Sequence, residues 1–106
     1  MISYFGKQAN GMAFTPSSET FGRAYALRYA ETTLSAYLQG QERDYAVRDV
    51  IGELEALFGA GASTPANLLT RAMALDPDDA GRLLLVTKAL DLIGQQVRAD
   101  AALAAK

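Results

Sequence analysis

Three carboxylates, Glu42, Asp49 and Glu53, have a spacing that places them on one face of a helix. Carboxylate oxygens are preferred ligands of Mg²⁺, and facing helical carboxylates hold two-metal sites in helical bundles. Those bundles normally add Glu-x-x-His motifs, and this chain has no histidine. We therefore interpret the three side chains as a solvated acidic face, and we predict neither a metal nor a cofactor.

A second acidic cluster, residues 76–81, resembles the start of an EF-hand calcium loop, with acids at its first and third positions and glycine at its sixth. The pattern then fails, because Ala80 stands at the fifth position and Thr87 replaces the bidentate glutamate at the twelfth. Acidic residues also stabilise the first turn of a helix. We interpret this cluster as the start of a helix rather than a calcium site.

Few other residues could support catalysis. The loop 59–64 is rich in glycine like a phosphate-binding loop, but it lacks the lysine and no strand is predicted before it. The chain has neither histidine nor cysteine, which excludes Ser-His-Asp triads, Cys-His dyads and ordinary zinc sites. We predict that the protein is not an enzyme. An enzyme using only Asp, Glu, Tyr and Arg would draw on Glu42, Asp49 and Glu53.

The composition is that of one folded domain. The chain has 106 residues, of which 50% are hydrophobic and 21% are charged, and its net charge is −2. Its apolar runs, such as Leu83 to Val86, are far too short to cross a membrane, and the N-terminus lacks a signal-peptide pattern. The absence of cysteine is consistent with the cytoplasm, which is the location that we expect.

The secondary structure predicted from the sequence is entirely helical. All three prolines follow a residue that caps helices, in Thr15-Pro16, Thr64-Pro65 and Asp76-Pro77, and each pair predicts a helix start. Glycines at positions 40 and 59 predict two helix ends. We predict an all-α, four-helix bundle-like single domain (15–106), with helices at about 16–39, 42–58, 65–75 and 77–99. Residues 1–14 are predicted to form a short irregular N-terminal arm.

Helix 16–39 has an unusually wide apolar arc, which predicts a central position in the bundle. A ladder at i, i+4 spacing, from Phe21 through Tyr25 and Tyr29 to Tyr37, lies beside a stripe of alanine and leucine. The ladder either packs in the core or forms part of a binding surface. Arg23 projects into this arc and either extends to solvent or pairs with an acid such as Glu19 or Asp44.

Helix 77–99 is apolar over about half of its circumference, and we expect a surface too large for one small domain to bury. This predicts a homodimer or a complex with another protein. The leading hypothesis is a small protein-binding module, such as an adaptor, chaperone or inhibitor, acting through an apolar helix face. Aromatic residues, arginine and leucines of the apolar helix face are the candidates for contact with the partner: Tyr4, Phe5, Arg23, Tyr25, Tyr29, Leu85 and Leu92.

The alternative hypothesis is a nucleic-acid-associated regulator that acts as a dimer. Two copies of five arginines could then form a basic stripe: Arg23, Arg28, Arg43, Arg48 and Arg71. The acidic net charge makes nucleic acid the less favoured partner, and no membrane partner is expected. Binding to phosphates weakens steeply with salt whereas apolar binding does not, so salt dependence discriminates between the two hypotheses.

Overall fold

The computed structural model describes residues 18–104, and these form four helices without a strand. They are α1 (Ser18–Leu38), α2 (Asp44–Phe58), α3 (Pro65–Met73) and α4 (Ala80–Ala104). The predicted all-α, bundle-like fold is confirmed. The predicted N-terminal arm, with Tyr4 and Phe5, and the predicted helix start at Pro16 lie outside the described residues.

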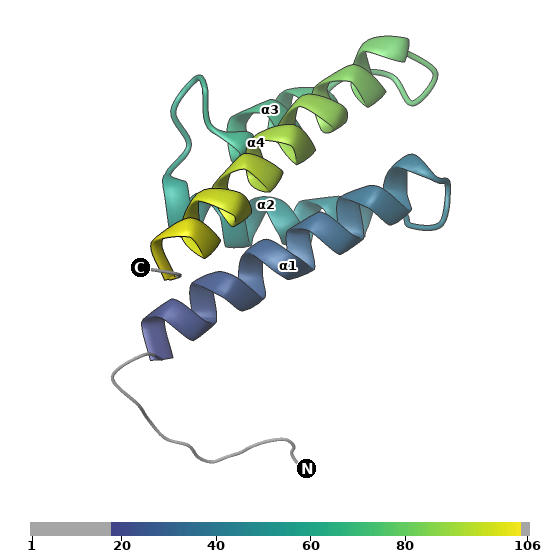
Figure 1. The fold of residues 1–106 in the computed structure, drawn as a ribbon. Helices are drawn as coiled ribbons and strands as arrows, with labels where there is room; N and C mark the ends of the chain where they lie inside the picture. Colours follow the sequence, from purple (N-terminus) through teal and green to yellow (C-terminus); the bar gives the residue numbers. More distant parts are fainter. Residues whose placement is uncertain (1–17, 105–106) are drawn as a thin grey trace.

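The four helices pack as a ring in which each helix contacts two others. Close contacts join α1 to α2, α2 to α3, α3 to α4, and α4 back to α1. Figure 1 shows α1 and α4 side by side in front, with α2 and α3 behind them. The prediction that the first helix is central is wrong, because within the described chain α1 packs closely against α2 and α4 alone.

The predicted glycine helix ends are confirmed. Gly40 has φ 78° and Gly59 has φ 79°, the left-handed region that glycine enters without steric cost. After α1, the N–H of Gly40 donates to the carbonyl of Tyr37 and the N–H of Gln41 to that of Ala36, the two bonds of a Schellman motif. Because the chain must then cross to the next helix in extended conformation at Arg43, α2 begins at Asp44 and not at residue 42.

The third predicted helix start is wrong, although the second is confirmed. Thr64 caps α3 by accepting a hydrogen bond from the N–H of Asn67, with Pro65 at the first helical position. Pro77 instead lies in a tight turn, in which the N–H of Asp79 donates to the carbonyl of Asp76. The Asp79 carboxylate accepts from the N–H of Gly81 at 2.8 Å, so it caps α4, which begins at Ala80 rather than Pro77.

Two other helix ends differ from the prediction. The α3 helix ends at Met73 and not at residue 75, and the carbonyls of Met73 and Leu75 accept hydrogen bonds from Arg82 instead of continuing the helix. The α4 helix continues to Ala104, well beyond residue 99. Alanine and leucine dominate this last stretch, and both favour helix.

The core lies inside the ring and receives side chains from all four helices. Twelve buried residues form one cluster, namely Leu27, Ala30, Leu34, Val47, Val50, Leu54, Ala66, Leu69, Ala72, Val86, Ala89 and Ile93. In contrast, Leu83, Leu84 and Leu103 of α4 are 48%, 67% and 70% exposed. The fold thus leaves large apolar side chains of α4 uncovered.

Between residues 18 and 104, none of the helices has the length and apolar character that crossing a membrane demands.

Candidate functional site

The described surface is hollowed at several places. One depression, of about 700 Å³, runs between α1 and α4 and contains none of the predicted partner-binding residues. Tyr25, Tyr29, Asp49 and Glu53 line a depression of about 400 Å³ between α1 and α2. A further depression, of about 510 Å³, we call the α4 notch, and it is lined by Phe58, Ser63, Thr64, Pro65, Leu92, Gln95, Gln96 and Ala99.

The predicted partner-binding residues therefore do not form one surface. Tyr25, which is 65% exposed, and half-buried Tyr29 lie between α1 and α2. Leu92 lines the α4 notch, whereas Leu85 packs against the core. Arg23 pairs with Asp100 of α4 rather than with Asp44, and the side chain of Glu19 lies outside the described part. The tyrosines of the ladder have different surroundings: Tyr37 contacts the core, whereas Tyr25 faces solvent.

The α4 notch results from the unequal lengths of α3 and α4. The α3 helix has 9 residues and α4 has 25, which correspond to about 14 Å and about 37 Å. Pro65, at the beginning of α3, already lies at the level of Leu92, so α4 continues past α3 for about three more turns. Figure 1 shows this yellow end of α4 running beyond α3. The notch is the space beside α4 that a longer α3 would fill.

Among the described residues, no charged side chain lines the α4 notch, and most of its polar side chains already have partners. The Gln96 amide donates to Asp100 at 2.8 Å and the Gln95 amide donates to Asp91 at 3.2 Å. The Thr64 hydroxyl donates to the carbonyl of Gly61 at 2.7 Å. Because three of the four polar side chains of the lining already make a hydrogen bond inside the chain and none is charged, the notch favours an apolar occupant over a charged one.

An ion pair behind the α4 notch orients two of its walls. The Arg23 Nε lies 2.7 Å from Asp100 Oδ2, and the Arg23 guanidinium carbon lies 5.1 Å from the centre of the Phe58 ring, within range of a cation–π contact. Asp100 also accepts from Gln96. These contacts favour the observed positions of Phe58 and Gln96, and the charge of Asp100 is compensated within the chain.

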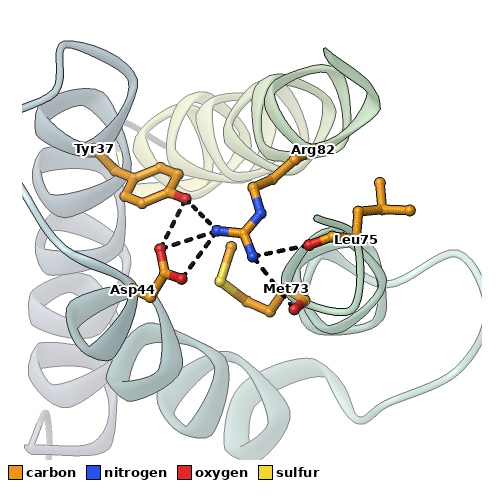
Figure 2. A network of polar contacts seen from close by, with 5 residues as sticks. All are labelled: Tyr37, Asp44, Met73, Leu75 and Arg82. Carbon is orange, nitrogen blue, oxygen red and sulfur yellow. Dashed lines mark hydrogen bonds and ion pairs between the residues drawn. The ribbon is translucent and has the colours of Figure 1, made fainter. Parts of the chain in front are cut away.

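A buried polar cluster around Arg82 is a feature that sequence reasoning missed, and Figure 2 shows it. Arg82 is only 5% exposed, and its Nη1 lies 2.9 Å from Asp44 Oδ2 and 3.0 Å from the Tyr37 hydroxyl. Its Nη2 donates to the carbonyls of Leu75, at 3.0 Å, and Met73. One guanidinium therefore joins the starts of α2 and α4 to the ends of α1 and α3.

The spacing of α4 could have revealed Arg82. Positions 82, 86, 89 and 93 share one helix face, and the last three form the buried stripe. Among residues 18–104, Arg82 Nε is a buried side-chain nitrogen without a hydrogen-bond partner. The guanidinium has a structural role, because its other two nitrogens are bonded to groups of the same chain and so hold helix ends together. We call it a structural tie.

Two carboxylates with lowered pKa values make the stability of the fold depend on pH in the acid range. The hydrogen bond from Arg82, followed by that from Tyr37, holds the pKa of Asp44 below its ordinary 3.8, although burial opposes this. Hydrogen bonds from Arg23 and then Gln96 likewise lower the pKa of Asp100. A lowered pKa in the folded state contributes stability above the unfolded pKa, and this stability is lost as pH falls through the folded pKa.

We therefore expect the free energy of unfolding to fall once the pH drops below about 4, where the unfolded carboxyls bind protons first. Urea unfolding at a series of pH values measures this. Asp100→Asn removes one of the two groups and should flatten the pH dependence. A wild-type unfolding free energy that stays constant from about pH 5 down to about pH 2 contradicts the expectation.

The carboxylates singled out in the sequence do not assemble into a site. Among residues 18–104, no three Asp or Glu side chains approach closely enough to hold a metal ion. Asp49 and Glu53 line the same depression as Tyr25 and Tyr29, and Asp79 caps α4. Comparison of the chain with family models, with curated proteins and with solved structures gave no match.

Proposed function

We propose that the protein is a small protein-binding module whose binding site is the α4 notch. The observation that carries the proposal is a notch of about 510 Å³ whose described lining is uncharged and whose polar groups are mostly bonded within the chain. Binding sites in proteins are concave and mostly apolar, and charged residues are depleted at the centre of protein interfaces. The partner would insert an apolar side chain between Phe58, Pro65 and Leu92.

The uncovered apolar side chains of α4 support the same proposal. Leu103 follows Ala99 by one turn on the same helix face and is 70% exposed, so it lies at the rim of the notch. Displacing water from such side chains favours association. An adaptor, chaperone or inhibitor in the cytoplasm would use the notch in this way, with the tyrosine-lined depression between α1 and α2 as a second contact.

The nucleic-acid alternative gains no support from the arrangement of the arginines. The proposed basic stripe needs Arg23, but Asp100 neutralises this guanidinium. Arg48 and Arg71 lie on α2 and α3, and on α2 the acidic residues Asp49 and Glu53 follow Arg48 closely. Protein recognition through apolar contact is therefore the function that we propose.

A substitution at Ala99 tests the proposed function. Ala99 is exposed and lines the notch, so Ala99→Arg should fill the notch with a charged side chain without affecting the core. We expect it to weaken capture of partner proteins from the native host by at least about tenfold, which corresponds to about 1.4 kcal/mol. Capture is measured by mass spectrometry on immobilised protein, and circular dichroism checks that the fold is retained.

Ala101→Arg is the matched control. Ala101 is exposed on the same helix, about 160° around its axis from Ala99, so the charge is added away from the notch. The control should capture the same proteins as the wild type. Equal capture by all three chains contradicts the proposed function, and so does capture by none from a chain that also shows no self-association.

A further inference from the structure

We propose that the partner in the α4 notch is a second copy of this chain, and that Leu103 of each copy inserts into the notch of the other. This inference rests on the proposed function, because it identifies the partner for the same site. The chain carries both halves of the contact on one helix. The notch ends at Ala99, and the exposed Leu103 side chain follows one turn later.

The positions of these residues around α4 support the pairing. Leu92, Ala99 and Leu103 follow one another at intervals of seven and four residues, so they form one stripe along the helix. The α3 helix does not cover this stripe beyond Leu92, because it begins at Pro65. Gln96 lies between Leu92 and Ala99 on this face, and its amide donates to Asp100 of its own chain, so the apolar side chains are the part of the stripe left for a second helix.

A two-fold axis lets both notches be filled at once. In a symmetric dimer the same patch of each copy faces its equivalent, so residue i contacts residue j and j contacts i. When two copies of one helix pack antiparallel, the residue numbers of each facing pair add up to the same total. Placing Leu103 of one copy opposite the middle of the notch wall, at Gln95, therefore places Ala99 opposite Ala99 of the second copy. The small alanine side chain allows the two helices to approach closely.

The charges near the stripe do not oppose this pairing. Within the described chain the notch has no charged lining residue, and Asp100, the acid that follows Ala99, is paired with Arg23 and Gln96 of its own chain. Two copies that meet at Ala99 therefore bring no unpaired like charges of the described lining together at the centre of the contact. Charge depletion at the centre of an interface is what a stable contact requires.

The absence of cysteine from the chain permits a direct test by cross-linking. In the full-length Ala99→Cys variant, the two introduced thiols should lie close enough across the two-fold axis to form a disulfide, which needs Cα atoms within about 7 Å. Under mild oxidation we expect a covalent dimer in non-reducing electrophoresis. Ala101→Cys introduces an exposed thiol on the opposite side of α4, and this variant should cross-link at least about tenfold more slowly.

Sedimentation equilibrium supplies a second measurement that needs no introduced thiol. The mass of the wild-type protein should rise toward twice that of one chain as its concentration increases, and Leu103→Glu should weaken this association by at least about tenfold. Because Leu103 is 70% exposed, this substitution should leave the circular dichroism spectrum unchanged.

The outcomes separate this inference from the proposed function. A concentration-dependent dimer that Leu103→Glu weakens, and that cross-links in the Ala99→Cys variant much faster than in the Ala101→Cys variant, supports the second copy as the partner. A monomer at every concentration, or equal cross-linking of both cysteine variants, overturns it. If that monomer still captures another protein and loses it on Ala99→Arg substitution, the proposed function stands with a different partner.

Discussion

Replacing Arg82 by alanine is expected to lower the free energy of unfolding by about 3 kcal/mol or more, among the largest effects of any single substitution in this chain. The Arg82 side chain is buried and bonds to Asp44, Tyr37 and two backbone carbonyls. The alanine variant leaves these groups without their donor and creates a cavity where four helix ends meet. Urea denaturation followed by circular dichroism measures the loss.

Arg82→Met is the informative comparison, because methionine restores much of the lost volume and carries no charge. The ion pair joins a buried guanidinium to the partly exposed carboxylate of Asp44, and desolvation of the guanidinium offsets much of the attraction between them. Arg82 also leaves its Nε unpaired. We therefore expect Arg82→Met to cost less than Arg82→Ala. If the unfolding free energy of Arg82→Ala stays within about 0.5 kcal/mol of the wild type, the guanidinium is not a structural tie.

Replacing Leu34 by alanine is expected to cost about 2–5 kcal/mol of unfolding free energy. Leu34 is 0% exposed and belongs to the buried cluster that receives side chains from all four helices. Shortening it removes apolar contacts and leaves a cavity that the surrounding helices can fill only in part. Thermal and urea unfolding both report this loss, because removing core contacts lowers the transition temperature and the denaturant midpoint together.

Leu84→Ala is the matched control, since the substitution is chemically identical but Leu84 is 67% exposed on the outer face of α4. Its cost should stay within about 0.5 kcal/mol, apart from the small difference in helix propensity, which favours alanine. Equal losses for the two variants would mean that α4 packs in a different orientation from the one described.

Local sequence patterns predicted the helices well, but contacts between helices decided several of their ends. Gly40, Gly59 and Thr64-Pro65 act within one turn of the chain, and their effects were predicted correctly. Pro77 can occupy either the first turn of a helix or a tight turn before it, and both obey the same local rules. The carbonyls of Met73 and Leu75 accept hydrogen bonds from Arg82 of α4 at the point where α3 ends. No local pattern in the sequence indicates this contact.

The candidate site was less predictable from the sequence, because it depends on a difference in length between two packed helices. Leu92 was predicted as a contact residue from its place on an apolar face, and it does line the notch. Phe58 and Ala99 were not predicted, since the first looks like an ordinary core position and the second like a fraying end. The partner of Arg23 lies 77 residues away in the chain, and helix periodicity carries no information about such a pairing.

The closure of the helix ring by α1 and α4 has a consequence for synthesis on the ribosome. The buried cluster takes Val86, Ala89 and Ile93 from the last helix, and the Arg23–Asp100 pair joins the two ends of the described fold. A nascent chain therefore cannot complete this core until α4 has left the exit tunnel. Until then α1 and α2 expose apolar faces, so the emerging helices are candidates for transient chaperone binding.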